Sequence, residues 1–344
     1  MFFWKLYVII INNLYFGKEL IGIIRKTRLC TEGFAASLFI ALAVLLILTS
    51  SFAIRFSDDL PLPVVTQDNM TRDIPVLMYH HLAPAETYQG TGDYANGAIV
   101  SLENFEAQMR YLYENGYQSI FTSELLEHFI SGESLPEKTV CITFDDGYES
   151  NYFYALPILE KYGFCATINP VISTSISEQV ISDSRGRNQY DLQSVRHFTI
   201  EQMEEMCAGG MIECHSHTFD LHGTVSVDRF GKTGNASTER AYLFELGRLE
   251  TNEEYYQRVY TDLSTAYLFL QKHCPTDYTA IFYPYGISTP TIVFIAKQVG
   301  YAGGFTVSRR IANLDRDDIF SIPRVTVSGE DTMSDFIRKL SYAK

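Results

Sequence analysis

The sequence predicts an α/β protein whose main domain is one distorted (β/α) barrel. Apolar runs of strand length alternate with helical patterns from residue 74 to residue 340, and no second linker interrupts them. Several of these runs end in polar residues. Such alternation is typical of a parallel sheet with crossover helices, in which chemistry gathers at the carboxyl ends of the strands. A hydrophobic content of 46% over 344 residues is ample for such a core.

The first half of this domain contains four predicted strands and three predicted helices. The strands are short apolar runs bounded by polar residues, Gly or Pro: residues 74–81, 117–121, 140–144 and 164–169. The helices have apolar residues three or four apart and mostly end at Gly: residues 102–115, 122–130 and 151–162. Residues 83–99 are punctuated by Gly and Pro and are predicted to be a loop.

The second half begins with a polar stretch, residues 172–197, which we predict to be a long loop at the mouth of the site. Thr199 and Gln202 form a capping box for a helix through Cys207, which Gly209-Gly210 ends. The remaining strands and helices follow the same patterns as before. They are strands at 211–217, 280–283, 302–307 and 322–327, helices at 251–273, 291–299 and 332–340, and a loop region at 223–250.

An uncharged apolar segment, Gly33–Ile54, precedes this domain. It exceeds the ~20 residues that a membrane-spanning helix needs. Basic residues precede it and acidic residues follow it, so the amino-terminal side is expected to stay in the cytoplasm. We therefore predict four parts: a cytoplasmic segment (1–33), a transmembrane anchor (34–54), an extracellular linker (55–72) and an exported domain (73–344). The alternative is a signal peptide cleaved near Ser51-Phe-Ala53, which would release a secreted protein.

The net charge restricts the class of binding partner, and the cysteine content restricts the expected disulfides. A formal net charge of −14 argues against a nucleic-acid partner. The six cysteines include no CxxC motif, and five of them follow the apolar segment, an odd number. Cys141 and Cys165 lie in predicted core strands, where a thiol behaves as a small hydrophobe. We expect no disulfide framework.

Two polar clusters follow predicted strands. Asp145 and Asp146 end the strand 140–144, and two adjacent carboxylates need a cation or a shared proton unless they form an ordinary Asp-Asp-Gly turn. His217 and His222 follow the strand 211–217, five residues apart. Two imidazoles and a carboxylate around an open position are a hydrolytic zinc arrangement. His215 shares a strand face with His217, so it is an alternative ligand or a supporting group.

Together these stretches resemble the polysaccharide deacetylase family, the NodB-homology carbohydrate esterases. The first family motif stands in full as Thr143-Phe-Asp-Asp-Gly147. The second matches His217-Thr218 and His222, with the spacing of the branch that acts on poly-N-acetylglucosamine, and the third matches Pro284-Tyr-Gly286. The resemblance covers about residues 73–328. It implies a NodB-type barrel and hydrolysis of an N-acetylated polysaccharide.

The resemblance also assigns roles. Asp146, His217 and His222 would bind a divalent metal, Zn²⁺ first, and Asp145 would be the general base that activates the attacking water. The backbone N–H of Tyr285 would help to hold the oxyanion.

Two departures from the family pattern leave roles open. No histidine follows His273, so the usual carboxyl-terminal Leu-x-His acid is missing. The best substitute is His80, with His81 second, at the end of the first strand. Tyr283 stands where many relatives carry the Arg that orients the base, and Arg324 from a neighbouring strand is the proposed replacement.

The resulting hypothesis is metal-dependent N-deacetylation of N-acetylglucosamine residues in an extracellular or cell-wall polysaccharide. Its alternatives are a catalytically silent glycan-binding domain of the same fold and an O-deacetylase of another polysaccharide such as xylan.

Overall fold

The computed structural model describes residues 70–85, 97–176 and 196–341. The predicted cytoplasmic segment and transmembrane anchor lie outside these ranges, as does all but the last few residues of the predicted linker. Over the residues that are described, the structure contains no helix with the length and apolar character of a membrane span.

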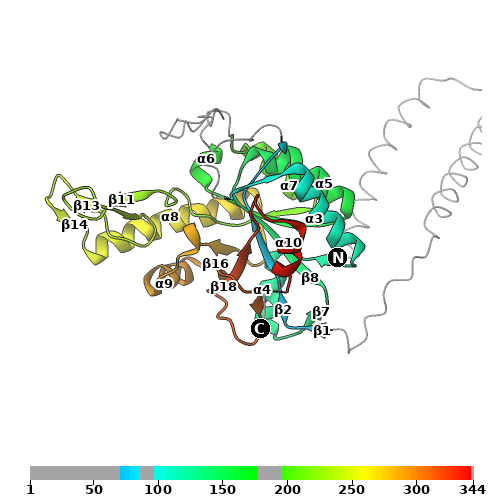
Figure 1. Cartoon of the computed structure of the whole chain (residues 1–344). Coiled ribbons are helices and arrows are strands. Elements are labelled where there is room, and N and C mark those ends of the chain that lie inside the picture. Colours follow the sequence, from blue (N-terminus) through cyan, green and yellow to red (C-terminus); the bar gives the residue numbers. More distant parts are fainter. Residues whose placement is uncertain (1–69, 86–96, 177–195, 342–344) are drawn as a thin grey trace, which may run out of the picture. The chain divides into compact units, whose positions relative to one another are not determined.

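A parallel sheet forms the centre of the described fold (Figure 1). Its main path runs in the spatial order β10 (Ile212–Cys214), β9 (Ala166–Pro170), β8 (Thr139–Asp146), β3 (Val76–Tyr79), β18 (Ile322–Thr326), β16 (Gly303–Val307) and β15 (Ala280–Phe282). Every neighbouring pair on the path is parallel. The short strand β6 (Gln118–Ser119) also pairs with β8. The predicted parallel α/β architecture is confirmed.

The two ends of this path meet just beyond β10. Ser216 forms an isolated parallel bridge with Ile281 of β15. The Ser216 N–H donates to the Ala280 carbonyl at 3.1 Å, and the Phe282 N–H donates to the Ser216 carbonyl at 2.7 Å. The strand path therefore returns to its start through this one bridge.

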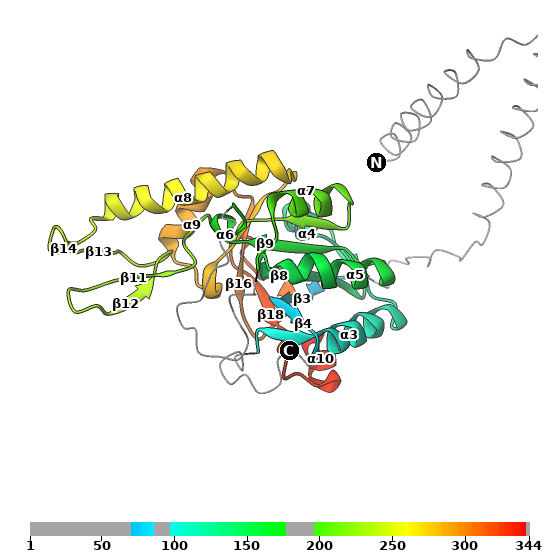
Figure 2. The ribbon, with the colours of Figure 1, turned by 90° about the horizontal axis from the view of Figure 1, so that it is seen from above.

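Helices lie around the outside of the strands (Figure 2). They are α3 (Leu102–Glu114), α4 (Thr122–Ser131), α5 (Leu156–Tyr162), α7 (Ile200–Ala208), α8 (Asn252–His273), α9 (Pro290–Val299) and α10 (Met333–Lys339), with a π-helical turn η4 (Asn151–Ala155) before α5. Thr199 and Thr251 each begin a helix with a complete capping box. The predicted helices are confirmed to within a residue or two at nearly every end.

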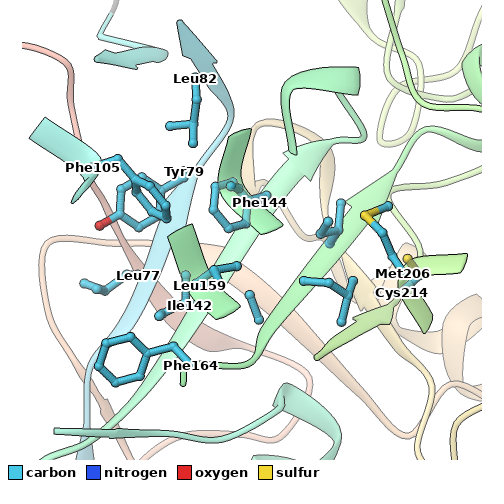
Figure 3. Packing of buried hydrophobic residues seen from close by; sticks show 14 of the residues in the cluster. Leu77, Tyr79, Leu82, Phe105, Ile142, Phe144, Leu159, Phe164, Met206 and Cys214 are labelled. Carbon is cyan, nitrogen blue, oxygen red and sulfur yellow. The ribbon is translucent and has the colours of Figure 1, made fainter. Parts of the chain in front are cut away.

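Alternation along β8 separates a core face from a site face. Val140, Ile142 and Phe144 belong to the largest apolar cluster, which fills the space between the strands and α3, α5 and α7. Figure 3 shows Phe144 beside Tyr79 and Phe105 in this cluster. Thr143 and Asp145 therefore lie on the opposite face of the strand.

Two predicted loops contain structure that the sequence analysis missed. The stretch after β9 begins with a short helix, α6 (Ile172–Ile176). Residues 223–250 form two hairpins, β11 (Thr224–Ser226) with β12 (Thr233–Asn235), and β13 (Tyr242–Leu243) with β14 (Arg248–Leu249). Figure 1 shows them beside the start of α8. Strands of two or three residues are too short to give a readable alternation.

Smaller strand pairs and a turn complete the described fold. They are β1 (Met70–Thr71) with β7 (Leu135–Pro136), β2 (Asp73–Ile74) with β17 (Ala312–Asn313), β4 (His81–Ala83) with β5 (Ile99–Ser101), and the 3₁₀ turn η6 (Pro284–Gly286).

One disulfide corrects the cysteine prediction. Cys207, in the last turn of α7, is bonded to Cys274, which follows α8, over a separation of 67 residues. Cys141 and Cys214 are buried thiols, and Cys165 is a partly buried one. The expectation of no disulfide framework did not anticipate this single bond, because an odd count and the lack of a spacing motif say nothing about two helix ends that meet only in the folded chain.

Candidate metal centre and active site

Asp146, His217 and His222 converge at the carboxyl ends of β8 and β10. The Asp146 Oδ1 atom lies 3.6 Å from His217 Nε2 and 3.4 Å from His222 Nε2. That same oxygen is buried and makes no hydrogen bond. All three ligand atoms lie within 4.8 Å of one another. An orphaned carboxylate oxygen facing two imidazoles fits a divalent metal, and the donor set suits Zn²⁺.

The backbone turns sharply to present Asp146. Asp146 has φ 71° and Gly147 has φ 75°, so two consecutive residues are left-handed. Asp tolerates this conformation better than most residues. A Cβ on Gly147 would lie 2.8 Å from Pro170 Cβ, which explains the glycine. The strand thus ends abruptly after its two carboxylates.

His217 is held in the form that can bind a metal. Its side chain is buried, and its Nδ1–H donates to the Phe282 carbonyl at 2.7 Å. This bond leaves the Nε2 lone pair facing Asp146. Burial lowers the pKa of His217 to about 4, so the imidazole is neutral near pH 7. The His222 ring lies against Tyr285, whose hydroxyl donates to the His222 carbonyl at 2.6 Å.

Asp145 faces Arg324. Burial alone would raise the pKa of Asp145, but the Arg324 guanidinium outweighs it and holds that pKa well below the ordinary value. Two parallel hydrogen bonds of 2.7 Å join Nη1 to Oδ1 and Nη2 to Oδ2. Arg324 lies on β18, is fully buried, and also donates to Thr143 Oγ1 at 3.1 Å. Tyr283 instead directs its hydroxyl to the Phe320 carbonyl.

The two histidines after β3 have different surroundings. Electrostatic interaction with His80 lowers the pKa of both Asp145 and Asp146, and the His80 Nδ1 is buried without a hydrogen-bond partner. His81 Nδ1 instead bonds Ser150 Oγ at 2.9 Å. Burial and then the nearby His197 lower the pKa of His81 to about 4. His80 is therefore the histidine that shares the carboxylates' electrostatic field.

The structure does not bring His215 into the site. Its Nε2 lies 2.9 Å from Glu213 Oε1, and its Nδ1 accepts the Ala280 N–H at 3.4 Å. The two histidines do share a strand face, because the His215 and His217 N–H groups donate to the Ile168 and Pro170 carbonyls of β9 while Ser216 between them donates to β15. His215 lies one step further from the carboxyl end of the strand, where it faces Glu213 and stacks on Phe282 instead of facing Asp146.

Some residues at the site escaped the sequence analysis. Asn169, at the end of β9, donates to Asp145 Oδ1 at 3.0 Å. Asn151 donates to the His80 carbonyl at 3.0 Å. A signal for Asn169 did exist, because it is a polar residue ending the strand next to β8. Nothing in the sequence pairs Asn151 with a residue 71 positions earlier.

The family model described as "Polysaccharide deacetylase" matches residues 132–304. A poly-β-1,6-N-acetyl-D-glucosamine N-deacetylase of Escherichia coli O157:H7 is 30% identical over 237 residues, which are 68% of this chain and 34% of that protein. This chain thus spans about a third of its length. The enzyme of the same name from Staphylococcus aureus (strain N315) is 26% identical over 240 residues, 70% of this chain and 71% of that protein.

Solved structures agree with the fold. A de-N-acetylase from Aggregatibacter actinomycetemcomitans superposes with a TM-score of 0.66 and 25% identity, covering 78% of this chain and all of that chain.

Proposed function

This chain belongs to the polysaccharide deacetylase family, and from that premise we propose that it is a metal-dependent hydrolase of N-acetyl groups. Its proposed substrate is an N-acetylglucosamine polymer outside the cell or in the cell wall, and its products are acetate and a free amine. The observation that carries the proposal is the convergence of Asp146, His217 and His222 beside a separate carboxylate, Asp145. The names of the relatives support the polymer.

The metal ligands in this proposal are the Asp146 carboxylate and the Nε2 atoms of His217 and His222. A divalent cation bound there, Zn²⁺ first, would polarise the acetamide carbonyl and lower the pKa of water. The burial of His217 favours metal binding, because this imidazole is already neutral and needs no deprotonation near pH 7.

The chain's own groups carry the protons. The Arg324 guanidinium stabilises the ionised form of Asp145. Asp145 is thus free to take the proton of the attacking water. The backbone N–H of Tyr285 is the proposed donor to the developing oxyanion. His80 gives a proton to the leaving amine, which would otherwise depart as an unstable anion. After one turnover Asp145 carries the proton of the water and His80 has lost one. Proton exchange with solvent restores both residues to their starting states.

The proposed location is extracytoplasmic, with residues 34–54 as the membrane anchor and residues 73–344 as the catalytic domain. Two features support it. Four basic residues shortly precede the apolar segment (Lys18, Arg25, Lys26 and Arg28), whereas one, Arg55, directly follows it. A disulfide between Cys207 and Cys274 is also typical of proteins that fold in an oxidising compartment.

The test is an acetate-release screen on poly-N-acetylglucosamine, peptidoglycan, chitin oligomers and acetylated xylan, with metal analysis of the same sample. We expect release from an N-acetylglucosamine polymer, loss with a chelator and recovery with Zn²⁺. Asp145→Asn should abolish release while metal content stays at the wild-type level. Release from xylan alone would favour O-deacetylation. A fully metal-loaded protein that acts on none of these polymers would refute the proposal.

A further inference from the structure

The four residues between His217 and His222 form a turn that is strained and heavily bonded. Thr218 has φ 75°, a left-handed conformation that a β-branched residue adopts only when its surroundings impose it. Its N–H donates to Ser216 Oγ at 3.1 Å, and its own Oγ1 accepts the Leu221 N–H at 3.0 Å. Local bonds therefore hold both ends of the turn but not its middle.

A carboxylate from a distant helix holds the middle of this turn. Asp262 Oδ1 accepts the Phe219 N–H at 2.9 Å, and Asp262 Oδ2 accepts the Asp220 N–H at 2.8 Å. Asp262 lies on α8, 42 residues beyond Asp220. Each oxygen thus binds one of two successive N–H groups, an arrangement that only a carboxylate can supply, because an amide has a single acceptor oxygen.

The opposite side of the turn is held as well. The Ile172 N–H donates to the Thr218 carbonyl at 3.2 Å, and the Ser173 N–H donates to the Phe219 carbonyl at 2.8 Å. Residues 172–173 fix the carbonyl side, and Asp262 fixes the N–H side. Burial raises the pKa of Asp262 to about 6, so it is ionised, and an acceptor only, near pH 7.

We propose that Asp262 is a positioning residue for the metal centre: by clamping Phe219 and Asp220 it fixes the turn that sets the separation of the two histidine ligands. The inference rests on the proposed function and deepens it. Asp262 bonds Phe219 and Asp220, which lie two residues from His217 and His222 respectively, and it bonds neither histidine. It therefore acts on the metal only through the backbone.

Asp262→Asn tests the clamp. The amide keeps one acceptor and places an NH₂ group against the other backbone N–H, so the strained turn relaxes. Losing an outer group that hydrogen-bonds a ligand typically weakens metal binding by roughly 10–100-fold, and we expect the same range for a group that fixes the turn between two ligands. Asp262→Glu keeps both oxygens on a stem one methylene longer, and we expect an affinity between those of wild type and Asp262→Asn.

Glu250→Gln is the matched control. Glu250 is a buried carboxylate that accepts the Ala241 N–H at 2.9 Å and pairs with Arg258 at 2.7 Å, so it also joins main chain to α8. It has no bond to the turn between the ligands. Its loss is expected to lower the melting temperature without changing metal affinity.

The experiment titrates Zn²⁺ into the metal-free full chain against a chromophoric chelator, for wild type and all three variants, and records the melting temperature of each metal-free protein. Wild-type binding with a 10–100-fold loss in Asp262→Asn, a smaller loss in Asp262→Glu and none in Glu250→Gln supports the clamp. At saturating Zn²⁺, kcat of Asp262→Asn should recover toward wild type with KM unchanged.

The outcomes separate the two proposals. A wild type that binds no Zn²⁺ overturns the metal-dependent function, and the clamp falls with it. A wild type that binds Zn²⁺ while Asp262→Asn binds equally well overturns the clamp alone. An equal weakening in Glu250→Gln also overturns it, because the effect would then be general destabilisation. If Asp262→Asn does not fold, wild-type affinity in Asp262→Glu overturns the clamp.

Discussion

Two adjacent residues of the same type have separate environments at this site. Asp145 points to the site face of β8, where its hydrogen-bond partners are Asn169 on the adjacent strand β9 and Arg324 on β18, two strands away. Asp146 adopts a left-handed turn conformation, and its Oδ1 atom faces two imidazoles instead. The sequence indicated two carboxylates that repel each other. The structure shows how the repulsion is relieved, with one charge neutralised by a guanidinium and the other directed at a ligand set.

Arg324→Lys should slow catalysis and change its pH dependence. Lys keeps the charge but cannot form both parallel bonds, and a charged hydrogen bond contributes about 1.5–3 kcal/mol, roughly 10–100-fold in kcat/KM. Arg324 opposes the burial that raises the pKa of Asp145. Weakening it raises that pKa, so the base is protonated sooner as pH falls. The acid limb of the kcat/KM profile should therefore move to higher pH.

The control for this prediction is Zn²⁺ affinity, which Arg324→Lys should leave unchanged because Arg324 touches no proposed ligand. A pH profile that superposes on that of the wild type would show that Arg324 does not tune the base.

His80→Ala is expected to lower kcat by about 10²–10⁴-fold, the usual range for a lost general acid. His81→Ala is its matched control, since His81 already bonds Ser150 and its pKa of about 4 leaves it unprotonated near pH 7. The measurement is acetate release at saturating Zn²⁺. A larger loss in His81→Ala than in His80→Ala would reverse the assignment.

At the scale of elements, the sequence predicted what local chemistry determines. Capping residues and αL glycines located the helix ends, and apolar runs located the long strands. The missed elements were hairpins too short to show a period, as at residues 224–235. The site was predictable where motif residues end strands. Asn151 and Asp262 were not, because their partners are brought close only by the tertiary fold.

The buried pair of Glu213 and His215 is the clearest case of a motif-like residue with a structural role. Glu213 on β10 accepts hydrogen bonds from Thr122 and Ser123 at the start of α4 and from Thr167 on β9. Leaving a buried hydrogen-bonding group without its partner typically costs about 1–3 kcal/mol. Glu213→Ala should therefore lower the free energy of unfolding by about that amount without altering Zn²⁺ affinity.

This pair also predicts a pH dependence of stability. Burial would raise the pKa of Glu213, but His215 and the hydroxyl donors lower it to about 2. A depressed carboxyl pKa stabilises the fold above the ordinary value near 4.5 and ceases to do so as pH falls toward 2. Between pH 4.5 and 2, urea unfolding of the wild type should show a steeper loss of stability than Glu213→Gln. Equal slopes would remove Glu213 as the cause.

At the scale of the whole described fold, the site depends on where the strand path closes. The first motif forms the carboxyl end of β8 in the middle of the path, whereas the second and third follow β10 and β15 at its two ends. The bridge between Ser216 and Ile281 brings those ends together. His217 can therefore donate to the Phe282 carbonyl on the opposite end strand. Sequence order alone gives no indication of this closure.

The disulfide lies near the same closure of the strand path. Cys207 precedes β10 and Cys274 precedes β15, so the bond joins the two segments that lead into the end strands. Closing a loop of 67 residues typically stabilises a fold by about 2–4 kcal/mol, mainly by restricting the unfolded chain. Replacing both residues, Cys207→Ser with Cys274→Ser, should lower the free energy of unfolding by that amount. Zn²⁺ affinity should persist, because Ser216 and Ile281 still pair.

Denaturant unfolding with and without a dithiol reductant measures this effect. The wild type should lose stability on reduction and become equal to the double variant, which should not respond to the reductant. If the reductant does not change the free energy of unfolding of the wild type, the disulfide does not stabilise the closure of the strand path. A double variant that keeps its fold but no longer binds Zn²⁺ would show instead that the covalent link, rather than the single bridge, holds His217 in place.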